Sequence, residues 1–73
     1  MSKLPRVSGE EAIQAFGRLG FRKVRQKGSH AILKKDGHRL LLSVPVHDEL
    51  RMGTLHRLIR DAGMTVDEFC AAR

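Results

Sequence analysis

The sequence contains no tryptophan or tyrosine and only three phenylalanines. Proteins that hold single-stranded nucleic acid by stacking its bases need exposed aromatic rings, so this composition disfavours such a platform. The single cysteine, Cys70, cannot form an internal disulfide. No apolar run is long enough for a signal peptide or a membrane span, and repeats and linkers are missing. These absences predict one cytoplasmic domain over residues 1–73, small for a fold held by a hydrophobic core alone.

Positive charge is concentrated in one third of the chain. The net charge is +6, and between residues 18 and 39 eight basic residues stand against one acid, Asp36. The eight are Arg18, Arg22, Lys23, Arg25, Lys27, Lys34, Lys35 and Arg39. Such a local excess is typical of a surface that binds a phosphate backbone, and also of a solvated face that does nothing more.

Capping residues and apolar spacing predict three helices. The first has Ser8 and Glu11 as a capping box before Ile13 and Phe16, and it ends at Gly20. The second begins near residues 53 and 54, and the third has Thr65 and Glu68 as another capping box, with Val66, Phe69 and Cys70 on one side. The second helix carries a buried face of Leu55, Leu58, Ile59 and Ala62 and is followed by Gly63.

Three strands are predicted between the first two helices. Residues 21–26 form a largely exposed strand with Val24 on its one covered face, and residues 27–30 form the turn after it. Residues 30–35 and 39–44 form a hairpin across Asp36 and Gly37, and Pro45 ends the last strand. The sequence thus predicts an α+β fold of order α-β-β-β-α with a short C-terminal helix. In it, a three-stranded antiparallel sheet has one face covered by helices, as in double-stranded RNA-binding domains.

The four histidines, at positions 30, 38, 47 and 56, do not have the spacing of a metal site. His38 and His56 are expected at the surface, and His47 is expected to orient the loop that follows Pro45. His30 begins a strand after a Gly-Ser turn in the basic segment. There an imidazole can serve as general base in RNA cleavage by the neighbouring 2′-hydroxyl, or simply contact a phosphate.

Three segments, "LGFRKVRQKGSHAIL", "VPVH" and "GTLHRLIRDAGMTVDEF", together resemble the HicA family of bacterial and archaeal toxins, also called YcfA-like proteins. The resemblance runs from about Ser8 to Phe69. The family pattern reads R-Q-x-G-S-H, then V-P-x-H, then a helix that begins G-T-L and ends A-G before a later phenylalanine. The sequence departs from it by having Met52 where a proline is common and a histidine at position 56.

The resemblance implies a double-stranded-RNA-binding-like fold and a ribosome-independent mRNA interferase, neutralised by a HicB antitoxin that covers its catalytic surface. It implies that His30 is catalytic, in a metal-independent reaction without a small-molecule cofactor. The motif glycine and serine, Gly28 and Ser29, would shape the turn that presents it. The residues expected to contact RNA are Arg25, Lys27, Gly28, Ser29, Lys34, Lys35, His47 and Thr54.

Two alternatives of other classes stay open at this point. The chain can be a non-catalytic RNA-binding module, although such modules usually carry a lysine cluster at the start of their last helix and "GTLHRLIRDAG" has none. It can also be an interaction protein whose basic face docks an acidic partner, in which case RNA affinity that depends on salt is not expected.

Overall fold

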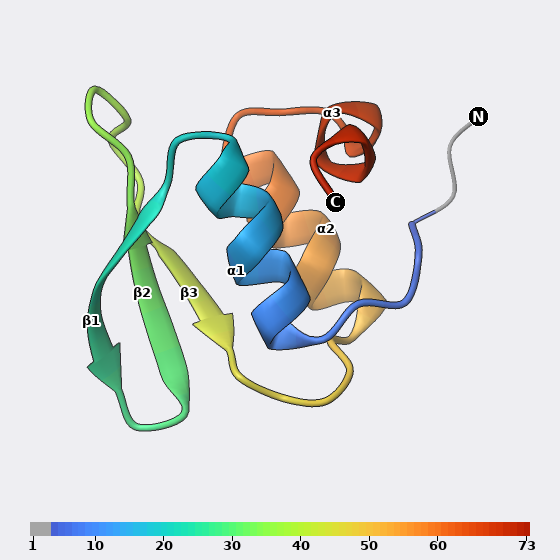
Figure 1. The fold of residues 1–73 in the computed structure, drawn as a ribbon, viewed down its shortest axis with the longest axis horizontal. Coiled ribbons are helices and arrows are strands. Elements are labelled where there is room, and N and C mark those ends of the chain that lie inside the picture. The colour runs from blue at the N-terminus through green and yellow to red at the C-terminus, as the bar shows by residue number, and fades with distance from the viewer. Residues whose placement is uncertain (1–3) are drawn as a thin grey trace.

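The computed structural model describes residues 4–73, and it consists of a sheet with helices on one side (Figure 1). The order of elements is α-β-β-β-α-α, which confirms the predicted α+β fold. The elements are α1 (Gly9–Arg18), β1 (Arg22–Lys27), β2 (His30–Lys34), β3 (Leu42–Pro45), α2 (Met52–Asp61) and α3 (Val66–Ala71). Within the described residues, no helix has the length and apolar character needed to cross a bilayer.

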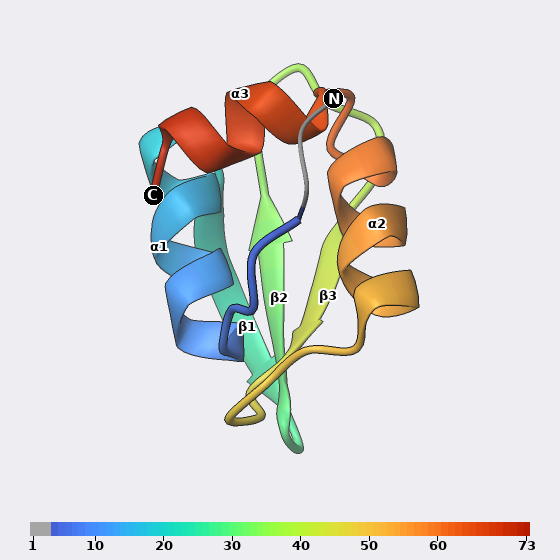
Figure 2. The ribbon, with the colours of Figure 1, turned by 90° about the vertical axis from the view of Figure 1, so that its right-hand side faces the viewer.

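The three strands form an antiparallel sheet in the order β1-β2-β3, so β2 is central and both other strands are edges. Helices α1 and α2 both lie on one face of this sheet, and α3 crosses above them at one end (Figure 2). The other face carries no element of residues 4–73. This is the open-faced arrangement of a double-stranded-RNA-binding-like domain, and it leaves one side of the sheet for a ligand.

The two predicted capping boxes are present. The side-chain oxygen of Ser8 accepts from the backbone N–H of Glu11 at 3.1 Å, and Glu11 accepts from the backbone N–H of Ser8 at 2.9 Å. Thr65 and Glu68 repeat the arrangement at α3. Each box satisfies two backbone donors that a helix start otherwise leaves unpaired, which explains why these helices begin where the sequence predicts.

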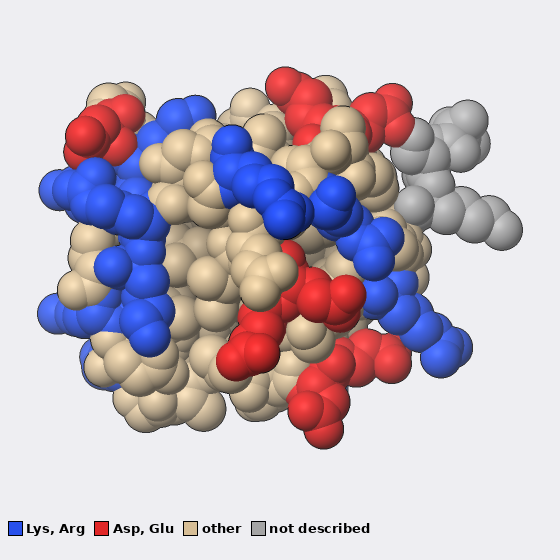
Figure 3. Space-filling view, in the orientation of Figure 1, with Lys and Arg blue, Asp and Glu red and all other residues tan. Residues whose placement is uncertain are grey.

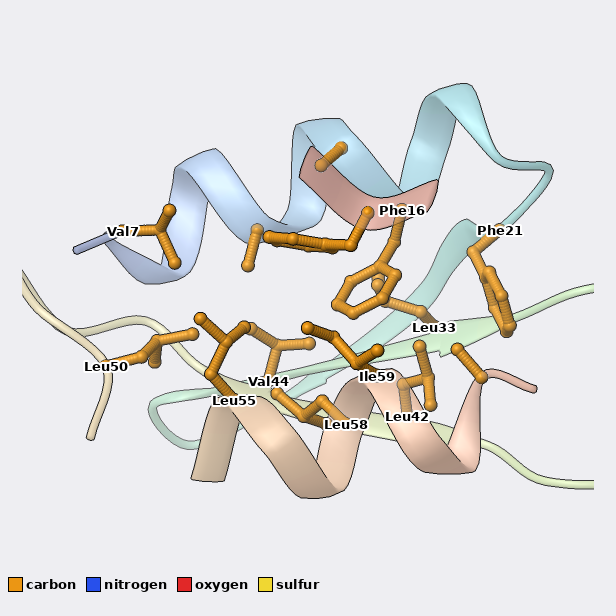
Figure 4. Close-up of a cluster of buried hydrophobic side chains, with 14 of the residues drawn as sticks. Val7, Phe16, Phe21, Leu33, Leu42, Val44, Leu50, Leu55, Leu58 and Ile59 are labelled. Carbon is orange, nitrogen blue, oxygen red and sulfur yellow. The ribbon is translucent and has the colours of Figure 1, made fainter. Parts of the chain in front are cut away.

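The core lies between the sheet and the helices and is built around phenylalanine (Figure 4). Phe16 of α1 and Phe69 of α3 are fully buried, with ring centroids 5.1 Å apart, and Phe21 packs edge-on against Phe16 at 5.9 Å. Leu33 of β2 and Leu55 of α2 fill the space below. All three aromatic rings therefore serve packing, and each contributes about 150–250 Å² of buried surface to a small fold.

The hairpin predicted between β2 and β3 is wrong in length. A turn does form at Asp36 and Gly37, closed by a hydrogen bond from His38 N to Lys35 O of 3.0 Å. Pairing resumes only at Leu42 instead of residue 39, so the connection spans residues 35–41. The prediction of His38 as a surface residue is also wrong. Its ring is half-buried against Phe21, with centroids 5.4 Å apart, and its Nε2 lies 2.6 Å from the backbone oxygen of Asp61.

Two further details of the strands differ from expectation. The prediction that Val24 lies on a covered face of its strand is wrong. The register of β1 shifts between Lys23 and Arg25, and Val24 is 45 % exposed in this bulge. The strand does not stop at Val44, because Pro45 is its last residue and pairs with His30. An edge strand tolerates proline because the missing N–H can face away from the ladder.

Candidate functional site

A two-residue turn of Gly28 and Ser29 joins β1 to β2 and places His30 at the start of β2. Gly28 has φ +59°, whereas Ser29 has a negative φ. A positive φ at the first central residue alone is the signature of a type II′ turn, whose twist matches that of the strands it joins. The side-chain amide of Gln26 donates to the carbonyl oxygen of Gly28 at 3.0 Å and braces the turn. The glycine of the G-S-H motif is therefore required by backbone geometry.

The strand register decides which side chains share a face with His30. Residues directly opposite each other in an antiparallel pair point to the same side of the sheet. Ala31 and Leu33 point into the core, so His30, Ile32 and Lys34 point to the open face. Their partners on β1 point there too. The pairs are Lys27 with His30, Arg25 with Ile32 and Arg22 with Lys34.

His30 is exposed and lies between Lys27 on β1 and Pro45 on β3. Two backbone hydrogen bonds hold the segment that follows Pro45. Val46 N donates to Ser29 O at 2.8 Å, and the oxygen of His47 accepts from Gly9 N at 2.9 Å. The V-P-x-H segment thus connects the turn before His30 to the first residue of α1, which gives the histidine a rigid surrounding.

The charge distribution follows the two layers. Lys and Arg run down the side of the molecule on which Figure 1 draws β1 and β2, whereas the helical side carries both signs (Figure 3). Among the described residues the one acid that touches the basic segment is Asp36, which accepts from Arg22 at 3.1 Å. An anion is therefore attracted to the strand side of the molecule.

The structure brings together most, but not all, of the residues predicted to contact RNA. Arg25, Lys27 and Lys34 share the open face with His30, and Gly28 and Ser29 form the adjoining turn. His47 is exposed at the same end of the sheet, two residues beyond Pro45.

Lys35 and Thr54 do not join this group. The Lys35 ammonium lies 5.8 Å from the centroid of the Phe21 ring, near Gly20, on the helical side. Thr54 is half-buried in the first turn of α2, in the helical layer. The N-cap of α2 is Arg51, and this helix start has no side-chain cap among the described residues.

Arg22 belongs to the open face, although the sequence did not identify it as a site residue. Simple alternation backwards from Lys27 and Arg25 selects Lys23. The bulge at Val24 inserts one residue and reverses the phase, so Arg22 faces outward with Lys34 and Lys23 does not. Bulges of this kind leave no clear signal in a single sequence, so only the register reveals Arg22.

The open face thus combines an exposed imidazole with ammonium and guanidinium groups in adjacent positions. Imidazole exchanges protons near neutral pH, and the flanking cations attract phosphates. Within residues 4–73 no three His, Cys, Asp or Glu side chains come close enough to form a metal site.

Comparison with known proteins identifies the family of the chain. No curated protein matches the chain significantly. The family model described as the HicA toxin of bacterial toxin-antitoxin matches residues 9–64, which include α1, the sheet and α2. The match covers more than half of the chain and contains the Gly-Ser-His turn. The chain therefore belongs to the HicA family, the toxins of bacterial toxin–antitoxin systems.

Proposed function

We propose that this toxin is an endoribonuclease that cuts mRNA without a metal ion or other cofactor, with His30 as its catalytic residue. The observation that carries the proposal is the position of the His30 imidazole on the open face, opposite the Lys27 ammonium and beside a rigid turn. A phosphodiester held by Lys27 lies next to a group that can move a proton. Family membership supports the same activity, since the resemblance implies an mRNA interferase.

The chemistry needs little apparatus because RNA carries its own nucleophile. The neutral imidazole of His30 takes the proton of a 2′-hydroxyl, and the resulting oxygen attacks the adjacent phosphorus. The Lys27 ammonium, directly opposite His30 in the ladder, stabilises the negative charge of the phosphorane. The bond to the 5′-oxygen then breaks, and the imidazolium returns a proton to that oxygen. The products are a 2′,3′-cyclic phosphate and a 5′-hydroxyl, with no water consumed.

The partner of this toxin is an antitoxin, as its family membership implies. We infer an acidic antitoxin of the HicB type that binds the open face and thereby covers His30. The excess of Lys and Arg over the strands supports this inference, because a partner with carboxylates there gains charge complementarity and excludes RNA. The proposal also places the toxin in the cytoplasm, where its mRNA substrate is found.

The experiment that tests the activity uses the isolated chain, freed of any co-purified partner, and a defined RNA in buffer with EDTA. The parent is compared with His30→Ala and His47→Ala, and the RNA ends are mapped. His56→Ala is the matched control, because His56 is also exposed but lies on α2. We expect cyclic phosphate ends from the parent and from His56→Ala, and none from His30→Ala. The His47→Ala variant reports whether a second histidine assists.

Three outcomes would contradict the proposal. Cleavage by folded His30→Ala at the parental rate would remove His30 from the mechanism. A parent that shifts RNA in a salt-dependent way but never cuts it would be a binding module, and a parent that does neither would be an interaction protein. Growth arrest on expression, compared for the same variants, gives an independent readout.

A further inference from the structure

The cations of the open face lie in single file along one hairpin. Lys27, Arg25 and Lys34 occupy three successive rows that begin beside His30. Rows two residues apart along a strand are separated by about 6.6 Å. This spacing is comparable with the separation of neighbouring phosphates in an extended nucleic-acid strand. The outward residues of β3, Ser43 and Pro45, are uncharged, so the line has no second line beside it.

A duplex would need more than one line of contacts. Domains that read double-stranded RNA bridge successive minor grooves and the phosphates between them. The helical side also carries Lys and Arg side chains, but acids lie among them (Figure 3). Glu10 and Glu11 begin α1, and Asp67 and Glu68 begin α3. The surface charge therefore fits one strand of RNA better than two.

The face also lacks a means of stacking bases. The three phenylalanines of the chain are all buried, and the apolar side chain at the centre of the cation line is Ile32. Ile32 is 7 % exposed although it lies outside the core cluster. Its neighbours in the same rows are long cationic side chains, whose aliphatic stems can cover it. Contacts on this face are thus directed at phosphates and carry little base specificity.

An acidic group marks the far end of the line. Arg22, opposite Lys34, is paired with Asp36 at 3.1 Å, and the Asp36 side chain is 86 % exposed. This pair neutralises the fourth cation and presents a carboxylate where a further phosphate would arrive. Beyond Lys34, Arg22 therefore adds no net positive charge that could attract an extended strand.

We propose that the open face binds one extended RNA strand lengthwise, with the scissile phosphate at Lys27 and His30 and the next two phosphates at Arg25 and Lys34. Asp36 marks the end of this line of phosphate contacts, which we call the track. The inference rests on the proposed ribonuclease function, because it assigns the scissile phosphate to the row of His30. It adds to that function the way the RNA strand lies, the number of phosphates contacted and the end of the contact line.

The test measures binding without cleavage, so its outcome is independent of the proposed catalysis. The probe is a fluorescent 2′-O-methyl RNA, which has no free 2′-hydroxyl and cannot be cut by the proposed route. Anisotropy titrations of the isolated chain use single strands of two to about eight nucleotides and a hairpin duplex of the same chemistry. With three phosphate contacts, affinity for the single strand falls about 20-fold between 50 and 200 mM salt.

Variants distinguish binding at these three cations from attraction by the overall positive charge. For Arg25→Gln and Lys34→Gln, loss of one contact reduces this salt effect to about 7-fold. Arg57→Gln, an exposed arginine on α2, is the charge-matched control and leaves the salt effect unchanged. Asp36→Asn increases affinity for strands longer than about four nucleotides. The proposal would be overturned if the duplex bound as tightly as the single strand or more tightly. It would also be overturned if Arg57→Gln reduced the salt effect as much as Arg25→Gln and Lys34→Gln do. Cleavage by the parent would stand in either case.

Discussion

The backbone of Gly9, at the start of α1, lies directly against Pro45 at the end of β3. A Cβ placed on Gly9 would collide with the carbonyl oxygen of Pro45 and lie 2.8 Å from the Cα of Val46. The hydrogen bond from Gly9 N to His47 O, 2.9 Å long, holds the two segments at this distance. Glycine is therefore required at position 9 by a close approach of backbone.

The first prediction follows from this contact. Gly9→Ala forces α1 away from β3 and destabilises the protein by about 1–3 kcal/mol. Gly17→Ala in the same helix is the control, because its Cβ would meet no atom of residues 4–73 within 4 Å. That change stabilises by about 0.5–1 kcal/mol, since alanine favours the helix. Urea unfolding of both variants measures the difference, and equal effects would refute the argument.

The second prediction concerns the turn before His30. At Gly28 a Cβ has open space around it, so the cost of a side chain comes from the positive φ alone. Gly28→Ala costs about 1–3 kcal/mol, the range for a side chain held in a sparsely populated backbone region. Gly28→Asn costs less, because asparagine follows glycine among the residues found in turns of this class. We expect stability and RNA cleavage to follow the order Gly, Asn, Ala. If alanine equals glycine in urea unfolding and in cleavage, the turn conformation does not matter.

The third prediction separates two histidines. His38 bonds the backbone oxygen of Asp61 and packs edge-on against Phe21, so it holds the 35–41 connection to the end of α2. His38→Ala lowers the free energy of unfolding by about 1–2 kcal/mol from the lost hydrogen bond and ring contact. His56→Ala, at an exposed position, changes it by less than about 0.5 kcal/mol. Thermal unfolding distinguishes them, and equal shifts would show that the His38 contacts contribute nothing.

The fourth prediction is a pH dependence. The backbone hydrogen bond from Ser8 holds the pKa of Glu11 below its usual value, and the Ser8 side chain and Arg73 act in the same direction. Because the folded state favours the carboxylate, the stabilisation is complete above the unfolded pKa of about 4.3 and disappears as the pH falls through the lower folded value. Glu11→Gln keeps the cap but removes the titration, so its stability falls less on acidification.

The control for this prediction is Glu10→Gln, at the neighbouring exposed acid outside the capping box. We expect this variant to lose stability in acid as the parent does. Urea midpoints at neutral pH and at about pH 3 measure the effect. An identical acid response of all three proteins would show that Glu11 does not contribute.

Local signals predicted most of the fold. The capping boxes at Ser8 and Thr65 and the apolar spacing of α2 depend on neighbouring residues, so they can be read from the chain. The connection after β2 could not, because Asp36 and Gly37 predict a turn but not where pairing resumes. The contacts of His38 with Phe21 and Asp61 hold this segment away from the ladder, and they join residues distant in sequence.

The site was predictable to a similar extent. The G-S-H motif predicts the turn at Gly28 and the strand that begins with His30, both of which the structure contains. The partition of cations between the two faces was not predictable, since the bulge at Val24 decides it. Lys35 follows Lys34 directly, yet its ammonium lies near the Phe21 ring and does not share the open face.

Strand β1 contributes no buried side chain to the fold, since all six of its residues are exposed. Substitutions at these positions therefore meet little resistance from packing, whereas those in β2 and β3 do. The side chains of β1 are therefore free of packing constraints from the core. The architecture is preserved by β2 and β3, whose core-facing side chains are buried.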